Sequence, residues 1–200
     1  MKKTIFFDLG NVLIFFDHKQ MCRQVAALTK IDEKTVTDIM HCHGDLYERG
    51  GISSQALHQE ICKAAKTPVD FNHLMHAVSN IFKPNPAVIA LALELKKNGH
   101  PLFLLSNTCE AHFDFARTQF DFLKEFDGYV LSYEVGLRKP EKKIFQKALE
   151  MAQCASQDCF YTDDILPYIE SARSLQIDAE QYTHPEALEK HLSSRGFINR

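Results

Sequence analysis

Residues 4–13 read TIFFDLGNVL, and this stretch decides the fold. Its first four residues, Thr4 to Phe7, form a short apolar run of the kind found in a strand buried on both faces of a sheet. Asp8 follows directly, and ligands of an open parallel sheet bind beyond the carboxyl ends of its strands. We therefore expect Asp8 at the mouth of a site, with Gly10 letting the backbone approach a ligand. The competing interpretation is an aspartate that merely ends a strand.

The composition indicates a globular protein that binds neither nucleic acid nor membrane. The 200 residues suit one domain with a small insertion, and a hydrophobic share of 45% is enough to bury a core. The net charge is −3, without a basic stripe, which argues against a nucleic-acid partner and fits a monomer or a homodimer. No segment approaches the roughly 20 apolar residues that cross a bilayer.

Six cysteines form no CxxC pair, and we expect free thiols in a reducing cytoplasm. The run His41-Cys42-His43 has two interpretations, a metal site or a solvated cluster. Neighbouring side chains on a helix point in different directions, and no second ligand pair follows. We therefore favour the solvated cluster.

The rest of the chain divides into two parts with different hydrophobic patterns. Residues 18–83 carry apolar positions at helical spacing and no strand signal, which predicts about four helices, preceded by a short extended piece at 14–17. Strands and helices alternate from Pro84 onward, which predicts an α/β fold with a Rossmann-like, doubly wound parallel sheet. We expect an α/β core of residues 1–16 and 85–200, with residues 17–84 inserted as a helical cap. The expected strands are 4–7, 102–105, 129–131, 159–162 and 177–182.

Polar clusters follow four of the predicted strands, and a parallel sheet would bring them to one edge. They are Asp8, Ser106-Asn107, Lys139-Pro140 and Asp163-Asp164. Three carboxylates repel one another unless a cation or a proton lies between them, and oxygen ligands suit Mg²⁺. Each cluster alone has a plainer interpretation, such as a helix cap or a solvated lysine.

Together the four clusters resemble the motifs of the haloacid dehalogenase (HAD) superfamily. The matching segments are FDLGNVL (7–13), LLSNT (104–108), GLRKP (136–140) and YTDD (161–164). Their order and strand context agree over essentially the whole chain. The first motif and the cap segment 47–53 are most similar to bacterial sugar-phosphate phosphatases of the glucose-1-phosphate type. The resemblance implies a Mg²⁺-dependent phosphatase of small phosphorylated metabolites.

The resemblance also implies a role for each motif residue. Asp8 is the nucleophile, and Mg²⁺ is held by Asp8, the carbonyl of Gly10 and Asp164, with Asp163 close by as a ligand or as support for one. On the phosphate side, the residues that bind the phosphoryl oxygens are Ser106 and Asn107. Lys139 neutralises phosphate charge and orients Asp8, which makes it the second catalytic residue.

Two positions depart from the family pattern. Gly10 stands where most of these phosphatases have a second aspartate, and a positioned acid–base group is worth about 10²–10⁴-fold in rate. One hypothesis is a good leaving group, such as the anomeric oxygen of a sugar 1-phosphate. The rival is a cap residue, His43 or Glu48, that delivers the proton. Tyr168 stands where the family often has an asparagine.

Three functions are therefore weighed: the phosphatase, a metal-independent dehalogenase-type hydrolase, and a catalytically weak binding or regulatory protein with the same fold. The acidic pair Asp163-Asp164 argues against the dehalogenase, which needs no metal. The cap is expected to select the substrate, and four of its residues are candidates to face it, namely His41, His43, Tyr47 and Arg49.

Overall fold

The computed structural model describes residues 2–199 and contains the expected α/β fold. Five parallel strands form one sheet in the order β5-β4-β1-β6-β7. The strands are β1 (Thr4–Phe7), β4 (Leu102–Ser106), β5 (Gly128–Leu131), β6 (Cys159–Asp163) and β7 (Asp178–Gln181). All four residues of β1 and all five of β6 are buried, as expected for central strands covered on both faces. The predicted doubly wound parallel sheet is thus confirmed.

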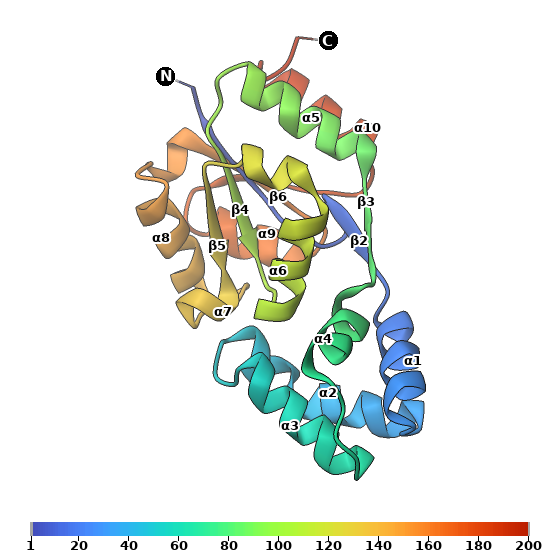
Figure 1. Ribbon diagram of the computed structural model, residues 1–200. Coiled ribbons are helices and arrows are strands. Elements are labelled where there is room, and N and C mark those ends of the chain that lie inside the picture. Colours follow the sequence, from blue (N-terminus) through green and yellow to red (C-terminus); the bar gives the residue numbers. More distant parts are fainter. Residues whose placement is uncertain (1, 200) are drawn as a thin grey trace.

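Helices cover both faces of the sheet (Figure 1). They are α5 (Pro86–Lys97), α6 (Glu110–Gln119), α7 (Ser132–Val135), α8 (Lys142–Met151), α9 (Leu166–Arg173) and α10 (Pro185–Ser194), with 3₁₀ turns at Asp121–Glu125 and Ser156–Asp158. On one face, Leu95 of α5 and Leu192 of α10 join the same apolar cluster as Phe7. On the other face, Phe145 of α8 and Ile169 of α9 pack with Phe6. Consecutive residues of β1 therefore anchor two separate layers.

Four helices between β1 and β4 in sequence form a second lobe. They are α1 (His18–Thr29), α2 (Glu33–Glu48), α3 (Ser54–Ala65) and α4 (Phe71–Ser79). Figure 1 shows this lobe at the carboxyl end of the sheet, opposite the two chain termini. Its apolar cluster includes Met21, Leu57 and Leu74, together with Cys109 and Ala111 at the start of α6. The lobe thus shares its core with one helix of the sheet layer.

A two-stranded ribbon carries the chain into and out of this lobe. β2 (Ile14–Phe16) pairs antiparallel with β3 (Phe82–Pro84). The extended piece near residues 14–17 was expected from the sequence. The prediction that residues 18–83 contain no strand is wrong, because β3 begins at Phe82. Three residues are too few to display a period of two, and their pairing partner lies far away in sequence.

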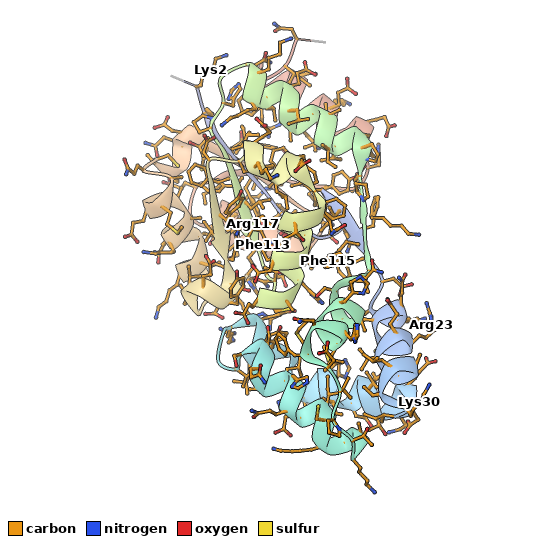
Figure 2. The ribbon with its side chains drawn as sticks, viewed as in Figure 1. Lys2, Arg23, Lys30, Phe113, Phe115 and Arg117 are labelled. Atoms are coloured by element: carbon orange, nitrogen blue, oxygen red, sulfur yellow. The ribbon has the colours of Figure 1, made fainter. Side chains whose placement is uncertain are left out.

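Side chains of α6 connect the sheet layer to the helical lobe. Figure 2 shows Phe113 and Phe115 on this helix, Arg23 on the outer side of α1, and Lys30 directly after the end of α1. Phe113 is buried and its ring lies 5.1 Å from that of Tyr129 on β5.

All six cysteines are free thiols, as expected. Within residues 2–199, no helix combines the length and the apolar character needed to span a bilayer.

Candidate active site

Three neighbouring strands end beside one another and carry the polar residues expected from the sequence. β1 lies between β4 and β6, and all three run parallel. Asp8 follows β1, Ser106 ends β4 and Asp163 ends β6. The amide of Asp8 donates to the carbonyl oxygen of Thr162 at 3.0 Å, so the backbone ladder continues up to Asp8. The carboxylate of Asp8 is therefore carried on a rigid support.

Lys139 enters from the loop between α7 and α8 and is the polar centre of this edge. Its Nζ donates to Asp8 Oδ1 at 2.7 Å and to Asp163 Oδ2 at 2.6 Å. A third bond, of 2.8 Å, goes to the carbonyl oxygen of Leu105. Only 3% of Lys139 is exposed, so the interpretation as a solvated lysine is wrong. Burial opposes its charge, but the carboxylates of Asp163 and Asp8 outweigh that effect and raise the pKa of Lys139.

Three carboxylates converge beside this lysine. Asp8, Asp163 and Asp164 each offer an oxygen, and these oxygens lie within 4.8 Å of one another, the one such group of possible metal ligands among residues 2–199. Burial raises the pKa of Asp8 to about 7, against the opposing charge of Lys139. Burial also raises the pKa of Asp164. A divalent cation would relieve this crowding, and an all-oxygen donor set fits Mg²⁺.

The two aspartates after β6 differ in how their oxygens are used. Asp163 is fully buried, and its carboxylate accepts from three donors, namely the Lys139 ammonium, the Tyr161 hydroxyl and the Ile165 amide. Asp164 is only partly buried and accepts a single side-chain bond, 3.2 Å long, from Asn11. Asn11 has a φ of +55°, a left-handed conformation that asparagine tolerates better than most residues. Asp164 therefore keeps more oxygen capacity for a ligand than Asp163.

Asn107 anchors the loop that delivers Lys139. The backbone amide of Lys139 donates to Asn107 Oδ1 at 2.9 Å, and Asn107 Nδ2 donates to the Lys139 carbonyl at 3.0 Å. Asn107 Nδ2 also donates to the hydroxyl of Tyr168 at 3.3 Å, and the Tyr168 ring centroid lies 5.2 Å from Lys139 Nζ. Tyr168 thus contacts both residues at the position where the family often has an asparagine.

A cavity of about 80 Å³ lies next to Asp8 in the chain, at Leu9 and Gly10, although the side chains of Asp8, Lys139 and Asp164 are not among its lining. Gly10, Ser106 and Asn107 line it from the sheet side. The opposite wall is made by aromatic rings and one carboxylate, namely Phe16, His18, Phe82, His112 and Glu48. Of the two cap residues expected as proton donors, Glu48 lines this cavity and His43 lines none of the cavities described here.

Gly10 is packed under the ring of Phe16. A Cβ at position 10 would lie 2.8 Å from Phe16 Cε1, closer than side chains normally approach. Phe16 is 36% exposed and lies on the short ribbon, so its ring has space to turn. An aromatic ring therefore stands over the position where most related phosphatases carry their second aspartate.

The remaining cap candidates are placed as follows. Arg49 pairs with Asp45 and, at 2.7 Å, with Glu141, so it joins the lobe to α8 and does not line the cavity. Tyr47 is buried, and its hydroxyl bonds Ser54 Oγ at 2.6 Å. His41 lines a second cavity, described below. The proposed solvated cluster at 41–43 contributes no metal ligands to the one acidic group found in residues 2–199.

Some contacts of this site were missed in the sequence. Asn11 and Tyr161 lie within the motifs, but nothing in their spacing shows that they hydrogen-bond the two aspartates. Arg138 pairs with Glu48 at 2.6 Å and with Asp45, joining the motif loop to α2. The only available signal was its place beside Lys139 in GLRKP.

Comparison with known proteins agrees with this geometry. The haloacid dehalogenase-like hydrolase family matches residues 2–176 of the chain. The solved structure of a HAD family enzyme from Bacteroides thetaiotaomicron, in complex with magnesium and inorganic phosphate, superposes with a TM-score of 0.79 at 22% identity. The match covers 92% of this chain and 95% of that one.

Two curated fungal proteins are also similar. A sesquiterpene phosphatase (astK) of Aspergillus oryzae is 21% identical over 175 residues, which is 86% of each chain. A drimenol cyclase (drtB) of Aspergillus calidoustus is 24% identical over 200 residues, 97% of this chain. The chain spans only 36% of the length of the cyclase.

Proposed function

The chain belongs to the haloacid dehalogenase-like hydrolase family, and from that premise we propose that it is a Mg²⁺-dependent phosphatase of small phosphorylated metabolites. The observation that carries the proposal is the buried Lys139 ammonium, hydrogen-bonded to both Asp8 and Asp163 beside the third carboxylate, Asp164. The phosphate and magnesium in the Bacteroides structure and the phosphatase among the relatives support the same chemistry.

The metal would be held by Asp8, Asp164 and the backbone carbonyl of Gly10. Asp163 lies within reach, but its oxygens already accept from Lys139 and Ile165, so we assign it to holding Lys139. When bound, Mg²⁺ would supply positive charge to the transferring phosphoryl group and hold it next to Asp8. The donor set fits this ion because it consists of hard oxygen atoms.

In the first chemical step, the free oxygen of Asp8 attacks phosphorus and the bond from phosphorus to the alcohol oxygen breaks. Asp8 becomes an aspartyl-phosphate, and the alcohol oxygen gains a proton. Lys139 neutralises charge on the phosphoryl oxygens, while Ser106 and the amides beside it bind them. In the second step, water attacks phosphorus and gives a proton to the base that protonated the alcohol, the bond from phosphorus to the Asp8 oxygen breaks, and inorganic phosphate and the Asp8 carboxylate are released.

The helical lobe, residues 17–84, would act as a cap that keeps water from the site during the first step. Ion pairs already join it to the sheet layer, through Arg138 to Glu48 at 2.6 Å and through Arg49 to Glu141 at 2.7 Å. Because Glu48 lines the catalytic cavity, it is the better candidate for delivering the proton that Gly10 cannot. Free cysteines support the expected cytoplasmic location.

The test is hydrolysis of nitrophenyl phosphate by the purified protein with Mg²⁺. We expect turnover that EDTA abolishes and that Asp8→Asn removes while the fold is retained. Activity that survives EDTA would favour the dehalogenase-type hydrolase. Absence of turnover in the folded, Mg²⁺-loaded protein would favour the binding or regulatory protein. The sugar 1-phosphate expected from the sequence stays a prediction, and a comparison of hexose 1-phosphate with hexose 6-phosphate hydrolysis tests it.

A further inference from the structure

A second cavity, of about 270 Å³, adjoins the catalytic cavity on the side of the helical lobe. It lies between α1, α2 and the start of α6, and we call it the chamber. His18, Glu48 and His112 line both cavities, so these three side chains form the boundary between them. The remaining lining residues are Met21, Cys22, Thr37, Met40, His41, Gly44, Tyr47 and Cys109. A group joined to a phosphoryl at Asp8 would pass from the first cavity into the chamber.

Part of the chamber wall consists of apolar, flexible or uncharged side chains. Met21 and Met40 bring thioether side chains, which adapt to irregular apolar shapes. Cys109 is 3% exposed, and burial raises the pKa of its thiol to about 12, so the thiol stays neutral. Burial lowers the pKa of His112 to about 4, so this ring is uncharged at neutral pH.

Three polar side chains of the chamber have protein partners, whereas Nε2 of His112 is buried without a hydrogen-bond partner among the described residues. The Tyr47 hydroxyl bonds Ser54 Oγ at 2.6 Å, and Thr37 Oγ1 donates to the Glu33 carbonyl at 2.8 Å. Glu48 is paired with Arg138 at 2.6 Å. A hexose would bring several hydroxyls into this space, and each one left without a partner lowers affinity by roughly 5- to 150-fold.

Aromatic rings form a continuous path from the phosphoryl position to the chamber. The ring centroids of Phe16 and His18 are 4.7 Å apart, and those of His18 and His112 are 6.5 Å apart. Phe82 lies 5.3 Å from His112, edge to face. This wall offers contact area to a hydrocarbon, and its polar atoms are the ring nitrogens of His18 and His112.

We propose that the chamber binds the alcohol portion of the substrate and that this portion is an extended apolar chain, such as a straight alkyl or an isoprenoid group, rather than a sugar. The proposal rests on the phosphatase function proposed above and narrows its substrate class. At about 30 Å³ for each water-sized group, 270 Å³ holds roughly nine such groups. A chain of about nine carbons would therefore fill the chamber.

The first experiment measures kcat/KM for n-alkyl monophosphates from ethyl to dodecyl, beside glucose 1-phosphate and glucose 6-phosphate. Burial of each methylene is expected to raise kcat/KM roughly fourfold until the chamber is full. The increase should stop near nine carbons, and octyl phosphate should exceed both sugar phosphates by at least about tenfold. A flat series, or a preference for either sugar phosphate, would overturn the proposal.

The second experiment reduces the volume of the chamber by enlarging one of its lining residues. Gly44 lies within α2, and a Cβ added there meets no atom within 4 Å, so Gly44→Leu should fold. With four added carbons in the chamber, kcat/KM should stop increasing at an alkyl chain about four carbons shorter than in the wild-type protein. The same change should lower kcat/KM for octyl phosphate by at least about tenfold. Cys42→Leu is the matched control, because Cys42 is exposed on the same helix and does not line the chamber. Equal loss for ethyl and octyl phosphate in Gly44→Leu would contradict the proposal.

Nitrophenyl phosphate separates this proposal from the function on which it rests. If the wild-type protein with Mg²⁺ hydrolyses nitrophenyl phosphate but prefers glucose 1-phosphate to every alkyl ester, the phosphatase stands and the apolar chamber is overturned. If neither the aryl, the alkyl nor the sugar phosphates turn over, the phosphatase itself fails and the chamber proposal fails with it.

Discussion

The sheet edge and the helical lobe use polar groups in opposite ways. At the sheet edge, charged side chains are buried and bonded to one another, with Lys139 within 2.7 Å of Asp8 and 2.6 Å of Asp163. In the lobe, the charged pairs lie toward the surface, as between Arg49 and Glu141, while thioethers, thiols and rings line the inner cavity. Under the two proposals, phosphoryl chemistry would depend on a few fixed atoms, whereas the choice of alcohol would depend on the shape and apolar area of the chamber.

Removal of the buried lysine ammonium at the sheet edge should have the largest effect on turnover and on stability. Lys139→Ala leaves the carboxylates of Asp8 and Asp163 buried without their shared donor. We expect turnover of nitrophenyl phosphate to fall by roughly 10³-fold or more, and the free energy of unfolding to fall by about 3–5 kcal/mol. Steady-state kinetics and urea unfolding measure the two effects. Lys143→Ala, on the exposed side of α8, is the control. A tenfold loss or less would show that Lys139 is not central.

A second change adds a carboxyl on the sheet side of the pocket, where Gly10 has no side chain. In Gly10→Asp with Phe16→Ala, the new carboxyl occupies the space of the removed ring. We expect kcat for an alkyl phosphate, a poor leaving group, to rise by up to about 10²-fold, with little change for nitrophenyl phosphate. Phe16→Ala alone controls for the lost ring. An equal change for both substrates would mean that the added acid acts on something other than the leaving oxygen.

Removal of the ion pairs that join the helical lobe to the sheet layer should have a smaller effect on activity. Arg138→Gln removes the pairs with Glu48 and Asp45. Because a partly exposed pair contributes about 1 kcal/mol or less, we expect KM to rise only about two- to fivefold, with kcat nearly unchanged. Arg23→Gln on the outer side of α1 is the control (Figure 2). A loss confined to kcat would assign Arg138 to the chemistry instead.

The last prediction concerns the pH dependence of stability rather than the activity at neutral pH. Burial lowers the pKa of His112 to about 4, from an ordinary value of 6.5. Between these values the unfolded chain binds a proton that the folded chain does not, so this residue makes stability fall as pH drops from about 6.5 to 4. His112→Asn should flatten that part of the curve in thermal unfolding at constant ionic strength. Parallel curves for the two proteins would mean that folding does not change the pKa of His112.

The sheet edge was largely predictable from the sequence, and the chamber was not. Asp8, Ser106 and Asp163 each follow an apolar strand run, and parallel topology alone brings such positions together. The chamber is lined by residues of α1, α2 and α6, whose spacing predicts helices but not how they cross. The contact of Phe16 with Gly10 has the same origin, because the ribbon depends on a partner strand far away in sequence.

The most direct test of the account is the location of the phosphoryl group during turnover. The protein is mixed with Mg²⁺ and saturating nitrophenyl phosphate, quenched in acid within milliseconds, and digested for mass spectrometry. The account predicts a phosphorylated peptide that contains Asp8, absent in Asp8→Asn. A phosphoryl group on any other residue, or full turnover by Asp8→Asn, would contradict it.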